Sequence, residues 1–396
     1  MPSVRDVVHG PWRAVPVLGV TQIIAWGTIF YSPVLTVPKI AAERGWSLAF
    51  AMGGFSLCLL VAGLVSPLVG RMIDRFGGHV VMTVGNLTGA LGLLALVHAA
   101  DRISYLLVWT LLGVGLAASL YDSAFATLGR IFGAAARSPI TVLTLAGGFA
   151  STVGWPSTHL LMGSVGWRGT YLIYAALLAL VCAPLHAFVL PRSRAVMAPP
   201  PDEGTKPPAL LPPHGIGFLL VAAAFASYAF VPSALSAHLL AVFGRSGIDA
   251  ATVVIIGALF GPAQVAARLT EFVFGRNLHP LTLARFAVIL QVAAFAMLAL
   301  LGISIPTAAA FALMFGAANG LITIARGAVP LALFGAVGYG ALIGRIAGPS
   351  LLMQAAAPLA LAFVIERISD PAALACAAAF ALIALACFAA IKRPRA

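Results

Sequence analysis

The sequence predicts an all-α membrane protein with twelve transmembrane helices in two pseudo-symmetric six-helix halves. Of its 396 residues, 61% are hydrophobic and only 9% are charged, whereas an ordinary soluble chain carries about 25% charged residues. The mean hydropathy of +1.05 agrees with this composition. The apolar residues also form long continuous runs, and a membrane-spanning helix needs about 20 of them. Continuous runs exclude a β-barrel, whose strands alternate polar and apolar positions.

Each predicted helix corresponds to one apolar segment, and the segments fall into two sets of six. Residues 191–214 between the sets form the only long polar stretch, and their many prolines prevent a packed helix. We therefore predict an N-terminal half at 1–190, a cytoplasmic linker at 191–214 and a C-terminal half at 215–396. The segments run at 14–38, 47–70, 80–99, 104–130, 138–163, 169–190, 215–242, 250–273, 282–301, 304–332, 338–365 and 371–391.

The basic residues predict the orientation of these helices. The first apolar segment exceeds a signal peptide in length and has no small-residue cleavage site, so we interpret it as a retained first helix. With a cytoplasmic N-terminus, fourteen Lys and Arg residues of the loops fall on the cytoplasmic side and six on the other. This imbalance satisfies the positive-inside rule. We expect a multi-pass protein of the cell inner (plasma) membrane with both termini in the cytoplasm.

Several function classes are disfavoured. The net charge of +12 comes from scattered single residues, so we expect no nucleic-acid partner. The four cysteines show no metal or redox spacing, and no paired carboxylates or nucleophile dyad suggests an enzyme. No phosphate-binding G-x-x-x-x-G-K-[ST] motif occurs, so ATP is not the direct driver. We expect no metal or cofactor. A non-transporting receptor would usually carry a folded extramembrane domain, for which 191–214 is too short.

The loop after the second apolar segment carries a recognisable motif. Residues 70–78 read GRMIDRFGG, which resembles the G-x-x-x-D-R-x-G signature between helices 2 and 3 of the major facilitator superfamily. Gly78 and His79 replace the basic pair that usually follows. Residues 166–168 read GWR, which resembles the start of helix 6 in many members.

The resemblance implies the major facilitator fold and a secondary transporter that works by alternating access. It also implies a small-molecule substrate, contact with the lipid bilayer and, we expect, function as a monomer. Gly70, Asp74, Arg75 and Gly77 would form the gating loop. Gly70 allows close backbone approach, Asp74 can cap a neighbouring helix N-terminus, and Gly77 permits the turn.

Two signals of proton-coupled drug antiporters of the superfamily are missing. Their helix 4 Arg is replaced here by Trp109, and their helix 5 Gly-Pro motif by Gly154-Trp155-Pro156. Drug efflux is therefore less favoured. A multidrug or metabolite efflux transporter with an apolar cavity remains the alternative function.

Four charged residues lie well inside apolar segments rather than near their ends, and we expect them to share one layer in the cytoplasmic third of the membrane: Asp122, Arg268, Arg326 and Arg345. A buried charge in a span costs at least about 2.5–3.5 kcal/mol, so each suggests a functional site. Arg268 and Arg345 could alternatively extend to the lipid headgroups. Helices 4 and 10 of a two-half transporter are symmetry-related, which makes an Asp122–Arg326 pair reasonable.

A cation in both helix 8 and helix 11 resembles the arrangement in oxalate:formate antiporters and monocarboxylate transporters. Arg268 and Arg345 would then bind a carboxylate through bidentate bonds. The monocarboxylate porters carry a carboxylate one turn before the helix 8 Arg, and this chain has Gln264 there. If a proton is carried, Asp122 is the remaining candidate. We therefore predict transport of a small organic anion, proton-coupled or by exchange.

Four further polar residues are candidates for substrate contact: Gln22, Tyr31, His238 and Asn319. They lie in the predicted helices 1, 7 and 10, which usually line the transport path together with helix 4. For each of them, a hydrogen bond between helices is the alternative role.

Overall fold

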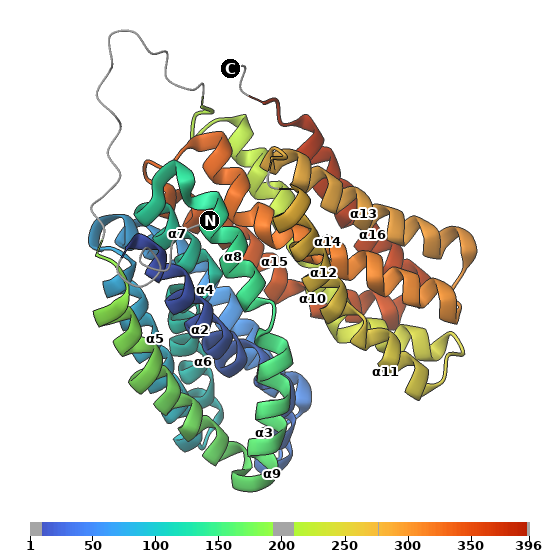
Figure 1. Ribbon diagram of the computed structural model, residues 1–396. Coiled ribbons are helices and arrows are strands. Elements are labelled where there is room, and N and C mark those ends of the chain that lie inside the picture. Colours follow the sequence, from blue (N-terminus) through green and yellow to red (C-terminus); the bar gives the residue numbers. More distant parts are fainter. Residues whose placement is uncertain (1–9, 193–209, 276, 394–396) are drawn as a thin grey trace. The chain divides into compact units, whose positions relative to one another are not determined.

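The computed structural model describes residues 10–192, 210–275 and 277–393, and every regular element in these ranges is a helix (Figure 1). Ten helical stretches among the described residues are long and apolar enough to cross a membrane. These observations confirm the predicted class, an all-α protein with many membrane spans.

One of the ten stretches, Arg102–Val189, is 88 residues long. A straight helix of that length would measure roughly 130 Å, several times the bilayer core of about 30 Å. Gly133 and Gly166 interrupt it with φ angles of +56° and +69°, which favour glycine because a Cβ would clash. The stretch thus divides into three segments, and the ten stretches accommodate the twelve predicted spans.

The described residues form two compact units. Unit 1 comprises Met1–Asp202 and Gly335–Gly348, and unit 2 comprises Glu203–Phe334 and Pro349–Ala396. The helix α15 (Tyr339–Arg367) therefore contributes its first residues to unit 1 and the rest to unit 2.

The sequence also predicted two halves joined by a linker. Residues 193–209 of the predicted linker lie outside the described residues. The division at 1–190, 191–214 and 215–396 stays a prediction.

In unit 1, small residues lie where helices meet. A Cβ on Gly85 of α5 would lie 2.6 Å from the Ala118 methyl carbon of α6, and a Cβ on Gly115 of α6 would lie 2.8 Å from Gly89 N of α5. Close approach of backbones through small residues is the usual basis of helix packing in membranes. The helices of unit 1 are α2 (Ala14–Ala25), α3 (Pro33–Arg44), α4 (Leu48–Phe76), α5 (Gly78–His98), α6 (Arg102–Ser119), α7 (Tyr121–Phe132), α8 (Arg137–Gly147) and α9 (Ala150–Leu177).

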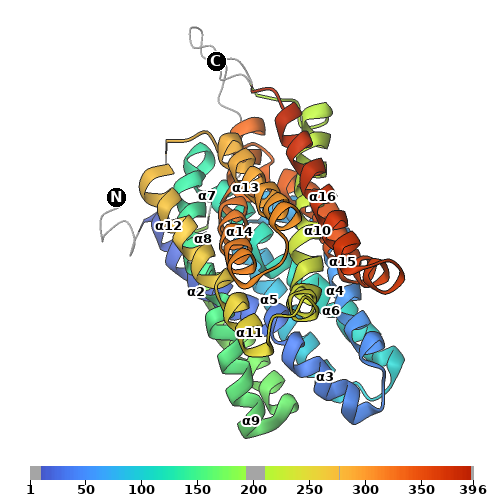
Figure 2. The same ribbon diagram turned by 90° about the vertical axis from the view of Figure 1, so that its right-hand side faces the viewer.

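Unit 2 has a core rich in phenylalanine. Phe311 stacks on Phe315 with ring centroids 5.5 Å apart and meets the edge of Phe295 at 5.3 Å. The helix α14 packs against both α12 and α13 (Figure 2). The helices of unit 2 are α10 (Ile216–Arg245), α11 (Ala250–Ala258), α12 (Phe260–Thr270), α13 (Pro280–Leu301), α14 (Ile305–Phe334), the second part of α15, and α16 (Asp370–Ala390).

Short π-helical turns interrupt several spans. They are η2 (Trp26–Tyr31), η4 (Leu178–Cys182), η5 (Leu185–Val189) and η6 (Glu271–Gly275). Such turns occur mostly as single insertions and are frequent at functional sites. Two of them adjoin residues singled out from the sequence, because η2 ends at Tyr31 and η6 begins three residues after Arg268.

In each unit, a bidentate ion pair links two helices that are far apart in the sequence. In unit 1, Arg168 Nη1 and Nη2 donate to Glu43 Oε2 and Oε1 at 2.9 and 2.5 Å, and the Trp167 indole also donates to Oε2 at 2.7 Å. In unit 2, Arg245 Nε and Nη2 donate to Asp370 Oδ2 and Oδ1 at 2.7 and 2.6 Å.

Candidate functional site

The loop motif at the end of α4 holds the N-terminus of α15. Asp74 accepts backbone hydrogen bonds from Gly340 N at 2.9 Å to Oδ1 and from Ala341 N at 2.7 Å to Oδ2. These are the first-turn donors of α15, which have no partner within their own helix. A carboxylate is favourable there because the helix N-terminus is partially positive. Asp74 therefore caps α15 with two charge-assisted bonds.

Glycines bring the two helices together at this point. A Cβ on Gly70 would lie 2.0 Å from the Gly340 carbonyl oxygen, and a Cβ on Gly344 would lie 2.2 Å from the Ser66 carbonyl oxygen. A Cβ on Gly348 would lie 3.0 Å from Gly63 O. Three glycines spaced four residues apart on α15 thus pack directly on the α4 backbone. Gly70 has the role of close approach that the sequence suggested.

The other two motif residues serve the turn and the surface. Gly77 ends α4 with φ +89° and donates its N–H to Ile73 O at 2.8 Å. Arg75 is exposed, and its guanidinium lies over the Phe76 ring at 5.1 Å.

Arg130 of α7 belongs to the same cluster, and the sequence analysis did not single it out. Its Nη1 donates to Ile73 O at 2.9 Å and also to the backbone oxygen of Asp74. The last carbonyls of α4 are thereby satisfied by a cation, which suits the negative end of a helix. One feature of the sequence could have indicated this role. Arg130 lies at the end of a predicted span, on the same predicted side of the membrane as the loop.

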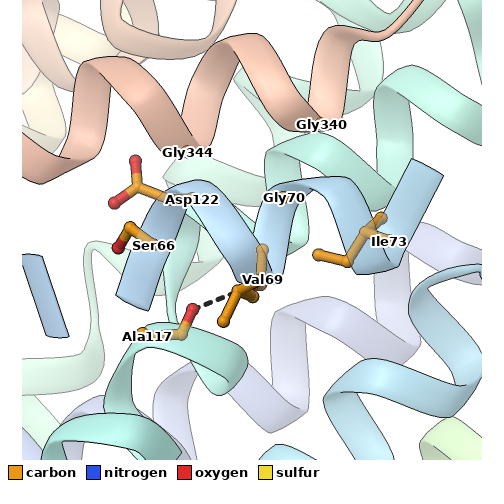
Figure 3. A pocket seen from close by; sticks show the side chains of 9 residues that line it. Ser66, Val69, Gly70, Ile73, Ala117, Asp122, Gly340 and Gly344 are labelled. Carbon is orange, nitrogen blue, oxygen red and sulfur yellow. Dashed lines mark hydrogen bonds between the residues drawn. The ribbon is translucent and has the colours of Figure 1, made fainter. Parts of the chain in front are cut away.

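Asp122 lies in the first turn of α7 and lines a pocket about the size of one water molecule (Figure 3). Ser66 of α4 lines the same pocket, as do Ala117 and Ser123 on either side of a break in the fourth span. Ser123 Oγ donates to Ala117 O at 2.7 Å, which satisfies a carbonyl at the end of α6. A carboxylate, a hydroxyl and a small cavity are therefore combined in unit 1.

The fourth span breaks at Leu120, between α6 and α7, and the Gln22 side chain hydrogen-bonds to the backbone beside this break. Gln22 is fully buried, and its Nε2 donates to the Ser119 carbonyl at 2.6 Å. Its Oε1 accepts from the Trp26 indole at 3.1 Å. Both ends of the amide are thus used within unit 1, which is the hydrogen-bonding role that the sequence left as the alternative to substrate contact.

Tyr31 lies in an aromatic cluster. Its ring centroid is 5.9 Å from Trp26, 5.4 Å from Phe30 and 5.6 Å from Trp155. Phe30 also meets Phe55 at 5.5 Å. This cluster joins the first, second and fifth spans and presents mainly apolar ring surface.

Arg268 is the most deeply buried cation that the sequence singled out in unit 2, with 4% of its surface exposed. Its Nε donates to Gly320 O at 3.3 Å, and its Nη2 donates to Thr323 Oγ1 and Gln264 Oε1 at 3.4 Å each. The guanidinium is thus hydrogen-bonded to α14. Thr323 was not singled out from the sequence, because a threonine in an apolar span carries no distinguishing pattern.

Two further candidates of unit 2 have partners. Asn319 Oδ1 accepts from Tyr228 Oη at 3.4 Å, and Tyr228 is itself 4% exposed. His238 Nε2 donates to the Pro358 carbonyl at 2.9 Å, where a proline interrupts the α15 hydrogen-bond pattern. Asn319 lies one turn before Thr323 and so belongs to the surroundings of Arg268, whereas His238 lies on α10 against the second part of α15.

The remaining charged candidates are divided between the units. Arg345, in the first part of α15, and Asp122, on α7, both belong to unit 1. Arg326 lies on α14 of unit 2. Arg326 and Arg345 are half-buried. The common layer of these charges and the Asp122–Arg326 pair stay predictions. Among the described residues, no group of three or more His, Cys, Asp and Glu side chains could hold a metal ion.

Many membrane-crossing helices, a capped inter-helix loop and charged side chains buried within spans define a multi-pass membrane transport protein. The model of the Major Facilitator Superfamily matches residues 17–325, and the chain belongs to this family. The resemblance read from the loop motif is thereby confirmed.

Solved structures share the fold. The human organic anion transporter MFSD10 (TETRAN) superposes with a TM-score of 0.71 and 16% identity over 99% of this chain and 100% of that one. FucP in the outward conformation superposes with a TM-score of 0.74 and 12% identity over 96% and 98%. At these identities the similarity concerns the fold alone, and it confirms the major facilitator fold.

Curated relatives include two kinds of transporter. An MFS-type efflux pump of Mycolicibacterium smegmatis is 31% identical over 48% of this chain and 45% of its own length. Human monocarboxylate transporter 11 is 29% identical over 52% and 44%, and mouse monocarboxylate transporter 4 is 32% identical over 38% and 31%. The matches thus span less than half the length of each of these relatives.

Proposed function

We propose that the chain is a secondary transporter of small organic anions. The observation that carries this proposal is the burial of the Arg268 guanidinium within a membrane span, on the backbone of α14. A permanently charged planar group in a low-dielectric site is suited to bidentate recognition of a carboxylate. The monocarboxylate transporters among the relatives support this substrate class.

In the proposed mechanism, Arg268 and Arg345 bind the anion, and Arg326 adds positive charge. Gly70, Asp74, Arg75 and Gly77 form a gating loop, in which Asp74 stabilises one arrangement of α4 and α15. Asp122 is the proposed carrier of a coupling proton, since it is a carboxylate in a pocket of unit 1. Without such a proton the protein would be an exchanger.

The test is anion binding by the purified full-length protein in nanodiscs, measured by thermal shift and calorimetry with acetate, lactate and oxalate. Ligand that binds only the folded protein raises the melting temperature. We expect the carboxylates to raise it, Arg268→Lys to weaken this effect and Arg268→Ala to remove it. Arg102→Ala is the matched control, because Arg102 is exposed and lies over the Phe50 ring. Normal carboxylate binding by Arg268→Ala would overturn the proposal.

Efflux of apolar compounds is a second candidate function. It is favoured by the aromatic cluster of Trp26, Phe30, Tyr31, Phe55 and Trp155, and by the similarity to the mycobacterial efflux pump. The same thermal-shift assay with lipophilic cations separates the two. Stabilisation by such cations that survives Arg268→Ala would favour efflux.

The proposed location is the cell inner membrane with both termini in the cytoplasm, and the proposed functional form is a monomer. The support is the excess of basic residues in the loops of the predicted cytoplasmic side. Reporter fusions at the C-terminus, one active only in the cytoplasm and one active only outside it, test the orientation directly.

A further inference from the structure

Arg268 occupies a defined place in the eighth span. It lies in the last turn of α12, and the π-helical turn η6 begins at Glu271. Only 4% of the Arg268 surface is exposed, although the next two residues of the chain, Leu269 and Thr270, are exposed. The neighbouring helix α14 contributes to this cover through Gly320 and Thr323, which accept hydrogen bonds from the guanidinium.

Two glycines of α14 make this close contact possible. A Cβ on Gly316 would lie 2.7 Å from Phe260 O, and a Cβ on Gly320 would lie 2.5 Å from Gln264 O. Both distances are shorter than real carbon–oxygen contacts, so the backbones of α12 and α14 touch where a larger residue would hold them apart. The spacing of four residues places both glycines on one face of α14.

The contact places polar groups of α14 on one edge of the guanidinium. Gly320 O accepts from Arg268 Nε at 3.3 Å, and Thr323 Oγ1 accepts from Nη2 at 3.4 Å. The Thr323 hydroxyl donates to Asn319 O at 2.7 Å, so its oxygen lone pairs are available to the arginine. These bonds to α14 constrain the orientation of the guanidinium, together with the bond from Nη2 to Gln264 Oε1 of α12 at 3.4 Å.

We propose that Thr323 and Gly320 are positioning residues of the anion site, which hold the plane of the Arg268 guanidinium in the direction required for bidentate carboxylate binding. This inference rests on the proposed function of Arg268. A guanidinium is rigid and planar, with its five N–H groups in fixed directions, so orienting the Nε and Nη2 edge orients the whole group. Holding the group in place before the anion arrives lowers the conformational cost of binding.

The first variant is Thr323→Val, which keeps the side-chain shape and removes the hydroxyl. We expect the dissociation constant for lactate and oxalate to rise roughly tenfold, as for loss of one hydrogen bond to a charged group. Thr323→Ser keeps the hydroxyl and should restore wild-type affinity. A residue needed only for packing would not be rescued in this way, because serine lacks the methyl group.

The second variant is Gly320→Ala, whose added methyl group would collide with Gln264 O and push α12 and α14 apart. We expect a larger loss of affinity than for Thr323→Val.

Thr270→Val is the matched control for Thr323→Val. Like Thr323, Thr270 donates its hydroxyl to the carbonyl four residues earlier, here Ala266 O at 2.9 Å, but it is exposed on α12. Thr270→Val should leave the dissociation constant unchanged.

Affinity is measured by calorimetry on nanodisc-embedded full-length protein with equal folded fractions, alongside Arg268→Ala. If Arg268→Ala binds the anions normally, the proposed function fails. If Arg268→Ala abolishes binding while Thr323→Val binds as tightly as wild type, the proposed function stands and the positioning role is overturned. A loss in Thr323→Val that serine does not rescue also overturns it.

Discussion

Arg168 and Glu43 form a two-point ion pair across 125 residues of chain, and Arg245 and Asp370 form another across the same separation. The polarity is reversed: the acid comes first in unit 1 and the base comes first in unit 2. Equal spacing is expected if the two sets of helices arose from one repeated unit. The two ion pairs thus have the same sequence separation, with the acid and the base in opposite order.

Exchanging the charges should have different results in the two pairs. Asp370 receives both of its bonds from Arg245, so Arg245→Asp with Asp370→Arg should recover most of the stability that either single variant loses. Glu43→Arg with Arg168→Glu should recover less, because the Trp167 indole loses its acceptor. Each single loss should be on the order of 1 kcal/mol, since the pairs are partly exposed. Urea or thermal unfolding in detergent measures this, and equal recovery in both pairs would contradict the role of Trp167.

Removing the cap on α15 should change transport kinetics. Asp74→Ala loses two charge-assisted bonds, and we expect turnover to fall about tenfold or more with little change in substrate affinity. In the proposed mechanism, the loop governs helix rearrangement and does not bind substrate. Asp249→Ala is the control, because Asp249 caps its own helix through Thr252 N at 3.0 Å and touches no gating element. A defect confined to the Michaelis constant would contradict the gating role.

A carboxylate at position 264 should make anion binding depend on pH. Gln264 Oε1 lies 3.4 Å from Arg268 Nη2, so an ionised Glu in Gln264→Glu would neutralise the guanidinium. Anion binding should then be weak at high pH and recover as the pH falls and the carboxyl is protonated. Binding at several pH values measures this, with Gln264→Met as the uncharged control. A flat profile for Gln264→Glu would mean that residue 264 does not control the charge of the site.

Asp122→Asn separates substrate exchange from proton coupling. If Asp122 carries the proton, this variant should keep exchange of labelled substrate across proteoliposomes and lose accumulation driven by a pH gradient. Ser66→Ala, which alters the same pocket without removing a charge, is the companion variant and should keep accumulation. Normal pH-driven accumulation by Asp122→Asn would leave Asp122 a structural residue.

The sequence predicted the spans well and their irregularities poorly. Among the described residues, the apolar runs coincide with the long helical stretches, because a membrane-spanning helix requires about 20 apolar residues in succession. The helices extend past those runs by several residues, as α4 does to Phe76, since helix ends continue into the polar interface. The break at Leu120 was not predicted, because neither Gly nor Pro marks it and its support, Gln22, comes from another span.

The candidate site was predictable in its charges and not in their surroundings. Arg268 and Asp122 are visible in the sequence as rare charges within apolar runs. The partners Gly320, Thr323 and Arg130 depend on which helix faces which, and no single-residue pattern reports that. Gln22 shows that a polar residue singled out as a substrate contact can also hydrogen-bond within the fold, and its role in substrate contact stays a prediction.

The glycine row of α15 has a consequence for reversibility. Gly340, Gly344 and Gly348 meet α4 through backbone atoms, and glycine has no rotamers to lose when a surface is covered. Separating and rejoining such surfaces therefore freezes and releases few side-chain torsions. In the proposed transport cycle this contact forms and breaks once per turnover, and glycines suit it because they have no side-chain torsions to reorder.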